Sequence, residues 1–428
     1  MTHQVLHSSE KPYDVVVVGT GLSGLKTAVK IQRAGFSVVV LEAMDRVGGK
    51  TLSIQSSIHG TGINDLGAAW VNDSSQSEIF ALFLEAGLRP EKQLTQGNTL
   101  RQVEDGSYVS VPFGQLFADE EEAAAFAVLF DALQKAVDAS DLEDPISGPD
   151  AKRLGSLTFS KYCHELLDSP QTPIIANYLT RALLGVEGNE VSTLLMVNYL
   201  KSGTGIENLV SDGPDGGQYL RADKGMHTIS KYLTSQLPAE SVRLNTVVKS
   251  ISQSPNGVQV ATAANKIFKA KRVVVSIPST LYPTISFSPE LPLSKSILAE
   301  GTAIGTYSKV IIVRKEKVWE QFTQAFEGSG VLGGKRVPEP IKSHEIAWKR
   351  NQYADGAPTA VMGPGVLTEL ARVTSNPLRE AWLRVHFVGT ETSLVWKGYV
   401  DGAVRSGIRG GQEVVKALQV DQKADSLA

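Results

Sequence analysis

The residues best suited to bind a ligand lie near the N-terminus, in a glycine turn that is followed by an acid. The turn from Gly19 to Gly24 reads GTGLSG, and Glu42 stands 18 residues after its last glycine. The first glycine permits a tight turn, the second lets a pyrophosphate approach the backbone, and the third allows close packing of helix on strand. A helix N-terminus supplies free N–H groups for phosphates, and the acid can accept ribose hydroxyl groups. This spacing predicts a site for an adenine dinucleotide.

Two strands and a helix must hold the turn and the acid in place. Residues 15–18 and 38–41 are apolar runs of valine and leucine, and a helix is expected between them. A strand, a glycine turn, a helix, a second strand and an acid in this order are typical of a Rossmann-type βαβ unit. The predicted fold class is therefore α/β.

The segment directly after this unit favours a flavin over a nicotinamide cofactor. Residues 45–51 read DRVGGKT. Their glycines let backbone amides approach a cofactor, and the basic side chains Arg46 and Lys50 can neutralise pyrophosphate charge. The run resembles the second signature of the FAD-binding fold shared by amine oxidases and their relatives, in which arginine is usual where Lys50 stands. Simple nicotinamide dehydrogenases do not need such an extension, so FAD is the expected cofactor.

A second glycine-rich segment lies near the C-terminus, where residues 386–409 read HFVGTETSLVWKGYVDGAVRSGIR. We expect a strand ending at Val388, a turn presenting Glu391 and a helix beginning near Gly398 or Tyr399. The glycines permit close approach of backbone to a flat ligand, and the helix N-terminus can face an electron-rich ring edge. The pattern GTETSxxWxGYxxGAxRSG resembles the FAD-contacting signature of the flavin monoamine oxidase family.

This resemblance implies oxidation of an amine by FAD. A neutral amine would lie between aromatic walls and pass a hydride to the flavin, O₂ would accept the electrons to give H₂O₂, and the imine would hydrolyse to a carbonyl and ammonia. By the resemblance Glu391 binds the ribityl chain, Thr392 lies near the isoalloxazine and Tyr399 forms one wall. Lys309 fits the lysine that holds a water at flavin N5. The catalytic residues so expected are Lys309, Tyr399 and Trp396.

The motifs and the resemblance together give a set of cofactor-binding residues and no metal site. The expected FAD-binding residues are Gly19, Gly21, Leu22, Ser23, Gly24, Glu42, Ala43, Arg46, Gly49, Lys50, Thr51, Gly67, Ala68, Ala69, Trp70, Val248, Gly389, Glu391 and Thr392.

The chain departs from the family pattern beside the expected flavin. Many members bind flavin covalently through a cysteine, and Ala357 stands at that position, so FAD is expected to be noncovalent. Pro358 stands where some relatives have the second aromatic wall. The candidates to substitute for it are Trp348 and a residue that does not align with the family.

A larger departure follows the strand that holds Lys309. Members of the family have a long strand-and-helix segment between that strand and the region matching Trp348. Here residues 317–319 run almost directly into residues 320–322, which resemble a helix that normally comes much later. Several dozen residues of the substrate domain are therefore expected to be missing, which would expose strand edges and apolar surface.

The cofactor motifs at both ends of the chain predict an interleaved architecture. A Rossmann-like FAD-binding domain would alternate with an α+β substrate-binding domain, the two-domain plan that the amine oxidases share with p-hydroxybenzoate hydroxylase. The expected FAD-binding segments are 12–82, 218–298 and 352–420. The expected substrate-domain segments are 83–217, mostly helical, and 299–351, shortened, with flexible tails at 1–11 and 421–428.

Composition limits partners and location. The 428 residues carry a formal charge of −3, which gives no reason to expect nucleic acid or an anionic membrane as partner. Cys163 is the single cysteine, which excludes an intrachain disulfide and fits a reducing compartment. No targeting sequence or apolar anchor is recognised, so a cytoplasmic protein is expected. The expected partners are a small-molecule amine and O₂; the oligomeric state stays open, with a homodimer as one option.

Two other functions stay open from the sequence. The first is a flavin-dependent desaturase or oxidative cyclase that tailors a secondary metabolite. The second is a noncatalytic FAD-binding remnant, because of the expected missing segment.

Overall fold

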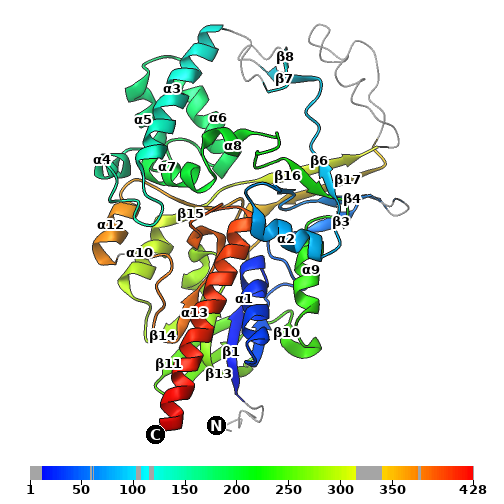
Figure 1. Cartoon of the computed structure of the whole chain (residues 1–428), viewed down its shortest axis with the longest axis vertical. Helices are drawn as coiled ribbons and strands as arrows, with labels where there is room; N and C mark the ends of the chain where they lie inside the picture. Colours follow the sequence, from blue (N-terminus) through cyan, green and yellow to red (C-terminus); the bar gives the residue numbers. More distant parts are fainter. Residues whose placement is uncertain are drawn as a thin grey trace, which may run out of the picture.

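A computed structural model of the chain describes residues 12–57, 60, 62–102, 108–114, 120–314, 340–374 and 377–427. One end of the molecule contains a large sheet covered by long helices, and the other end contains mostly helices (Figure 1). The expected N-terminal tail, 1–11, lies outside the described residues.

Among the described residues, eight strands form the large sheet, in the order β10-β2-β1-β13-β12-β11-β14 with β19 also paired to β13. These strands are β1 (Tyr13–Val18), β2 (Val38–Leu41), β10 (Val242–Arg243), β11 (Val248–Ser254), β12 (Gly257–Thr262), β13 (Ile267–Val275), β14 (Ser286–Ser288) and β19 (Val385–Phe387). Strands β1, β2, β10, β13 and β19 run parallel, and β12 is antiparallel to both its neighbours. All four residues of β2 are buried, as are residues 15–18 of β1. Continuous apolar runs of this kind belong to parallel strands covered on both faces.

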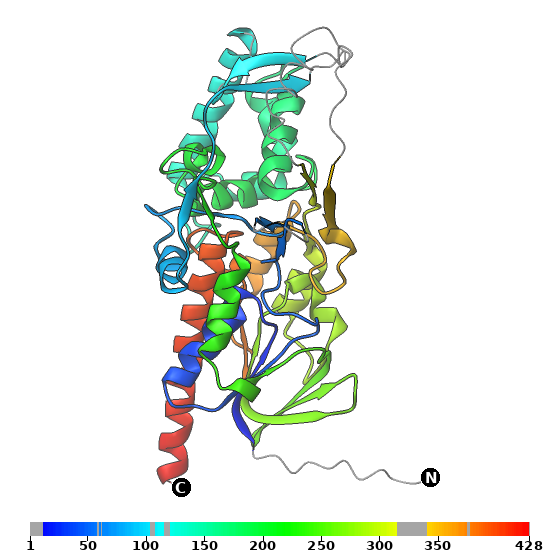
Figure 2. The same cartoon turned by 90° about the vertical axis from the view of Figure 1, so that its right-hand side faces the viewer.

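Two helices cover one side of this sheet. Helix α1 (Leu22–Arg33) and helix α13 (Val400–Leu427) lie side by side along the strands (Figure 2). They approach closely, since a Cβ atom at Gly407 would lie 2.6 Å from the Ser23 carbonyl oxygen. The N-terminal and C-terminal ends of the chain thus build one layer.

Every strand of the large sheet comes from one of three separate stretches of chain. These stretches fall within the segments 12–82, 218–298 and 352–420. The chain therefore leaves the large sheet and returns to it twice, and the predicted α/β fold class is confirmed.

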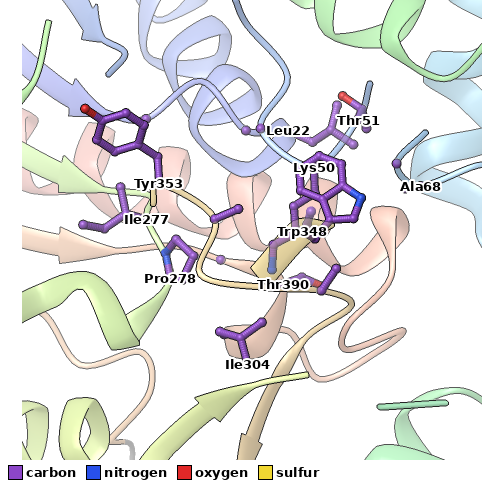
Figure 3. A pocket seen from close by; sticks show the side chains of 18 of the residues that line it. Leu22, Lys50, Thr51, Ala68, Ile277, Pro278, Ile304, Trp348, Tyr353 and Thr390 are labelled. Atoms are coloured by element: carbon purple, nitrogen blue, oxygen red, sulfur yellow. The ribbon is translucent and has the colours of Figure 1, made fainter. Parts of the chain in front are cut away.

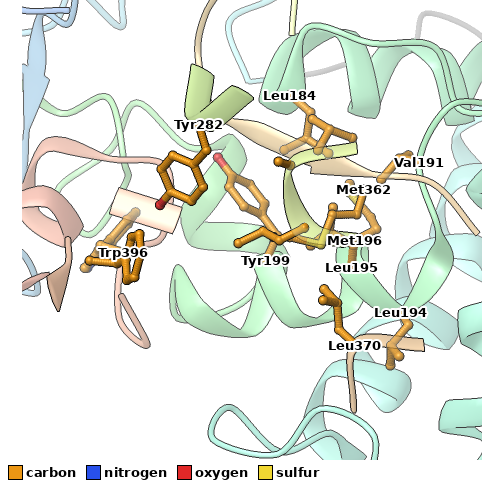
Figure 4. Packing of buried hydrophobic residues seen from close by; sticks show 14 of the residues in the cluster. Leu184, Val191, Leu194, Leu195, Met196, Tyr199, Tyr282, Met362, Leu370 and Trp396 are labelled. Carbon is orange, nitrogen blue, oxygen red and sulfur yellow. The ribbon is translucent and has the colours of Figure 1, made fainter. Parts of the chain in front are cut away.

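The other end of the molecule is a bundle of helices. Its helices are α3 (Glu120–Ala139), α4 (Ala151–Ser156), α5 (Phe159–Leu166), α6 (Thr172–Leu184), α7 (Thr193–Ser202) and α8 (Ile206–Val210). The Thr158 and Ser192 side chains cap α5 and α7 by accepting backbone N–H groups of the first turn. Helix α7 is buried on nearly all sides, and its apolar residues join one large core cluster (Figure 4). Cys163 of α5 belongs to this cluster, and burial raises the pKa of its thiol to about 12.

Further short strands and helices lie around and between the two ends (Figure 1). The strands are β3 (Ser53–Gln55), β4 (Ile63–Asp65), β5 (Trp70–Val71), β6 (Pro90–Lys92), β7 (Asn98–Gln102), β8 (Tyr108–Pro112), β9 (Leu220–Ala222), β15 (Thr302–Ile304), β16 (Ser308–Val313), β17 (Lys342–Ala347) and β18 (Ala360–Met362). The helices are α2 (Ser77–Glu85), α9 (His227–Ser235), α10 (Leu293–Gly301) and α12 (Val366–Val373), with short 3₁₀ turns η1 (Ala239–Ser241), η2 (Ser279–Thr284), η3 (Trp348–Arg350) and η4 (Thr390–Thr392).

Strands β16 and β17 form an antiparallel ribbon with one open face. Side chains alternate along β16, so that Lys309 points inward while Val310 and Ile312 are 60% and 53% exposed. Apolar surface was expected here if part of the substrate domain is missing. The predicted junction itself, residues 317–322, lies outside the described residues.

The C-terminal end differs from the predicted tail. Helix α13 continues to Leu427, where the sequence predicted a flexible segment from 421 onward. The segment has no glycine or proline to end the helix, and Asp421 accepts two hydrogen bonds of 3.0 Å from the Arg272 guanidinium of β13. This ion pair fastens the last turns to the sheet.

No helix among the described residues is long and apolar enough to cross a membrane. Within the same part of the chain, histidine, cysteine and acidic side chains do not gather in groups of three or more that could hold a metal ion.

Candidate functional site

A cavity of about 610 Å³ lies where the sheet, the connecting strands and the helical end meet. Its walls come from the N-terminal, middle and C-terminal parts of the chain. Figure 3 shows labelled side chains from these parts around the cavity. Its size and partly enclosed form suit a cofactor with a substrate beside it.

The three glycines of the first turn differ in the way that dinucleotide binding requires. A Cβ atom at Gly19 would lie 2.9 Å from the Ser276 carbonyl oxygen, and one at Gly24 would lie 2.2 Å from that of Gly19. A Cβ atom at Gly21, by contrast, would meet nothing within 4 Å, and Gly21 lines the cavity. Gly19 and Gly24 therefore allow packing, and Gly21 leaves the backbone open to a ligand.

The acid at the end of β2 is held against the turn. Glu42 is buried, and its Oε2 accepts a 2.8 Å hydrogen bond from the Thr20 backbone N–H and a second from the Thr20 hydroxyl. Its Oε1 accepts from the backbone N–H of Met44 at 2.9 Å. The carboxylate is thereby fixed in the wall of the cavity, in the position expected for a ribose contact.

The two basic residues of the 45–51 loop lie in different places. Lys50 lines the cavity, its Nζ lies 3.4 Å from the Pro358 carbonyl oxygen, and burial lowers its pKa to about 8. Arg46 does not line the cavity. It donates to the carbonyl oxygens of Val47, Gly49 and Thr51, and so it holds the loop in shape.

Two residues of the last third of the chain, Thr359 and Glu391, bring unpaired polar atoms to the same cavity. The Oε1 atom of Glu391 and the Oγ1 atom of Thr359 are buried, and within the described structure neither has a hydrogen-bond partner. Both residues line the cavity, and burial raises the pKa of Glu391. Buried polar atoms without partners in the protein are the expected contacts of a polar cofactor chain. Thr392 lies behind this surface, where its hydroxyl donates to the Gly389 carbonyl oxygen at 2.8 Å.

Lys309 reaches the cavity from strand β16. Its Nζ donates to the backbone carbonyl oxygens of Asp65 and Gly67, each at 2.9 Å, and lies 5.8 Å from the centre of the Trp70 ring. Burial lowers the pKa of its ammonium. The two carbonyls accept two of its three N–H groups, which leaves one donor for a water or ligand.

Tyr399 forms an aromatic wall that is supported from behind. Its ring packs edge-on against Trp396 at 4.9 Å between centroids and stacks with Tyr199 of α7 at 6.5 Å. Tyr399 and Tyr199 line the cavity, and burial raises the pKa of both hydroxyls. Trp396 is fully buried outside the lining, and its indole N–H donates to the Ser75 carbonyl oxygen at 3.1 Å. Trp396 therefore supports the ring of Tyr399 from behind and does not face the cavity.

The region expected to carry the second aromatic wall has small residues. Ala357 and Pro358 line the cavity there. Trp348 also lines it and packs against Ala357, while its indole N–H donates to the Leu66 carbonyl oxygen at 3.1 Å. Trp348 is thus held beside the small residues and adds aromatic surface to this part of the cavity.

Most of the predicted site residues meet at this one cavity. The lining includes Gly19, Gly21, Leu22, Ser23, Glu42, Ala43, Gly49, Lys50, Thr51, Gly67, Ala68, Ala69, Trp70, Val248, Lys309, Gly389, Glu391 and Tyr399. Four predicted residues lie outside it, namely Gly24, Arg46, Thr392 and Trp396.

Sequence reasoning missed the contribution of the helical end. Leu183 of α6, Tyr199 of α7 and Gln218 before β9 all line the cavity. Tyr199 reads as an ordinary core residue of an apolar helix. The one available signal was Gln218, a polar residue that directly follows two glycines.

Comparison with known proteins agrees with this site. The model of the family described as flavin containing amine oxidoreductase matches residues 22–332 and 322–415. A flavin-containing amine oxidase of Oncorhynchus mykiss is 28% identical over 466 residues, covering 95% of this chain and 87% of that protein. Amine oxidase B of Sus scrofa is 28% identical over 462 residues, with 95% and 86% covered. Both alignments are longer than the 428-residue chain, so these relatives have residues without a counterpart here.

Solved structures share the fold. Cyclohexylamine oxidase from Brevibacterium oxydans superimposes with a TM-score of 0.85 at 24% identity, covering 96% of this chain and all of the other. Putrescine oxidase bound to putrescine gives 0.82 at 23% identity, with 95% and 99% covered. The glycine cradle and the unpaired polar atoms fit FAD, the cofactor of this family. The chain belongs to the flavin-containing amine oxidoreductases and is an amine oxidase.

Proposed function

We propose that the protein oxidises the C–N bond of an amine to an imine, with O₂ as the electron acceptor and H₂O₂ as the second product. The amine loses a hydride from carbon and a proton from nitrogen, and water then hydrolyses the imine to a carbonyl compound and ammonia. The observation that carries this proposal is the meeting of Lys309 and Tyr399 with the glycine turn at a single cavity.

Different residues would bind different parts of FAD. The open backbone at Gly21 and the N-terminus of α1 would bind the diphosphate, and Glu42 would accept from the adenosine ribose. The unpaired oxygen of Glu391 would meet the ribityl chain. Since Ala357 offers no sulfur for a covalent bond, FAD would be noncovalent. When bound, FAD supplies the acceptor for the substrate hydride and passes the two electrons to O₂.

The chain itself orients the substrate and excludes water. Tyr399, supported by Trp396 and Tyr199, would present a flat wall to the amine and restrict its approach. The third N–H of Lys309 would hold a water beside the reacting atoms. The wall formed by Tyr399 with Tyr199 and Trp396 would shield this end of the cavity from bulk water.

Flavin spectroscopy tests this proposal. The purified protein should show visible flavin absorbance, denaturation should release the FAD, and an amine should bleach it under anaerobic conditions. Admission of O₂ should restore the colour and produce H₂O₂. A protein that takes up no FAD would contradict the whole proposal. A yellow protein that no amine bleaches would contradict the reaction alone.

A further inference from the structure

The short turn that ends in Tyr399 lies against a single helix, α7. We call residues 396–399 the wall turn. At its start the Trp396 backbone N–H donates to the Ser202 carbonyl oxygen at 2.7 Å, and at its end the Tyr399 ring stacks on Tyr199. Helix α7 therefore supports both ends of the wall turn.

Lys397 makes a third contact with α7, between these two. Its Nζ donates to the side-chain oxygen of Asn198. Asn198 is buried, and its Nδ2 donates to the Asp141 carbonyl oxygen at 3.4 Å, which leaves its oxygen to face Lys397. Burial lowers the pKa of Lys397 to about 8, so near pH 7 the donor is mainly an ammonium. Hydrogen bonds from a charged donor are stronger than those between neutral groups.

The backbone of the wall turn is strained on both sides of Lys397. Trp396 has φ 52° and Gly398 has φ 85°, so both lie in the left-handed region. A residue other than glycine is disfavoured there and keeps this conformation where the surrounding structure fixes it. Lys397 joins these two residues, and its bond to Asn198 fixes the wall turn at that point.

Lys397 has no place in the cavity wall itself. Among the described residues, the cavity lining includes Gly398 and Tyr399 but not Lys397. The charged groups that act on its ammonium are Arg379, which lowers its pKa, and Glu391, which raises it. An effect of Lys397 on a bound amine would therefore pass through the wall turn.

Resting on the proposed oxidation, we infer that Lys397 is a positioning residue, which sets the ring of Tyr399 against the amine through its bond to Asn198. The role does not follow from the family resemblance, because the pattern GTETSxxWxGY leaves the residue between Trp396 and Gly398 unspecified. Loss of the bond would leave the ring present but less restricted. A poorly oriented wall lowers the rate of reaction more than the affinity for the substrate.

Flavin reduction tests this role in the FAD-bound protein. Stopped-flow absorbance at pH 7.0, with cyclohexylamine and benzylamine under anaerobic conditions, gives the limiting rate of reduction and the dissociation constant of each amine. In Lys397→Met and in Asn198→Leu we expect the limiting rate to fall about tenfold and the dissociation constant to change less than about twofold. An unchanged rate, or a loss confined to affinity, would overturn the inference.

Two further variants test the bond between the two side chains. The double variant Lys397→Met/Asn198→Leu should be about as slow as either single variant, because each removes the same bond. A loss of about 100-fold, the product of two independent effects, would overturn the inference. Asn198→Asp keeps an oxygen acceptor for the ammonium and should retain most of the wild-type rate. A rate as low as that of Asn198→Leu would contradict the role of the bond.

Lys201→Met is the matched control. Lys201 also lies on α7, but its Nζ donates to the carbonyl oxygens of Val137 and Asp138, at 3.1 and 3.0 Å, near the end of α3. This variant should lower the thermal stability and leave the limiting rate of reduction unchanged. An equal loss of rate in Lys201→Met would assign the effect to the packing of α7 and overturn the inference.

Amide hydrogen exchange provides a readout that needs no amine. Exchange of residues 394–400 in the FAD-bound protein should become faster in Lys397→Met and stay unchanged in Lys201→Met. Unchanged exchange in Lys397→Met would overturn the inference even if the oxidation is observed. A wild-type protein that neither amine reduces would contradict the oxidation, and the exchange result would still decide whether Lys397 holds the wall turn.

Discussion

The rings of Tyr199 and Tyr399 stack with their centroids 6.5 Å apart and their planes inclined by 29°. Tyr199 belongs to a helix of the buried core, and Tyr399 belongs to the segment that precedes α13. The contact therefore connects packing in the helical end directly to the wall that faces the predicted flavin.

Replacing the supporting ring should affect both stability and turnover. Tyr199→Ala removes a buried aromatic side chain and should cost about 3 kcal/mol in the free energy of unfolding. It should also lower kcat/KM about tenfold, because Tyr399 loses the surface that orients it. Denaturant unfolding and steady-state kinetics measure the two effects. Tyr199→Phe keeps the ring and should retain most of the stability and most of the kcat/KM. If Tyr199→Phe lost as much of each as Tyr199→Ala, the effect would come from the hydroxyl.

Removing the ammonium of Lys309 should slow the reaction without removing the cofactor. In Lys309→Met the water expected beside the reacting atoms loses its donor, and we expect about a 100-fold decrease in flavin reduction or reoxidation. Stopped-flow absorbance separates these half-reactions. Lys349→Met is the matched control, since Lys349 is a partly exposed lysine outside the lining. Unchanged rates of both half-reactions in Lys309→Met would refute the role.

The affinity for FAD should fall as the pH rises through about 8. Burial lowers the pKa of Lys50 to about 8, so its side chain is cationic below this pH and neutral above it. The anionic diphosphate of FAD favours the cationic form, so binding above pH 8 must take up a proton and weakens by up to about tenfold per pH unit. Titration of the apoprotein with FAD between pH 7 and 9.5 measures this. Arginine stays charged over this range, so in Lys50→Arg the affinity for FAD should not change with pH. If the affinity of this variant still falls as the pH rises, the pH dependence belongs to another group.

Alanine substitutions at two glycines of the first turn should have different effects, one on FAD binding and the other on stability. Gly21 has φ −61°, so alanine is allowed there, and its Cβ atom would point into the open cavity. Gly21→Ala should therefore keep the thermal stability of the apoprotein and weaken FAD binding at least tenfold. Gly24→Ala brings its Cβ atom against the Gly19 carbonyl oxygen and should lower the stability itself by a few kcal/mol. Calorimetry measures the stability of each apoprotein, and titration measures its affinity for FAD. A Gly21→Ala protein that is destabilised but binds FAD normally would contradict the prediction.

The sequence was sufficient to predict the strands, the glycine turn and the acid near the N-terminus, because local chemistry determines them. The buried valine runs, the glycine turn and the acid at Glu42 each have one physical reason to occur in that order. The expected turn at Glu391 and the helix start near Tyr399 were also found, as η4 and the beginning of α13.

The remainder depends on contacts that the sequence does not display. Arg46 binds carbonyl oxygens of its own loop, and a basic residue beside a phosphate motif gives no sign of this alternative. Trp396 supports the wall while Tyr399 forms it, yet both stand in the same motif. Tyr199 enters the cavity from a helix whose spacing predicts only a core.

Strand β16, with its exposed Val310 and Ile312, pairs with a single neighbour in the described chain. A two-stranded ribbon is marginally stable by itself, so the bonds from Lys309 to the Asp65 and Gly67 carbonyls also attach this strand to the backbone at the end of β4. The lysine to which we assign a part in the proposed reaction would then also stabilise the position of this strand. Its loss should let β16 open more often, with faster amide hydrogen exchange there than in the large sheet.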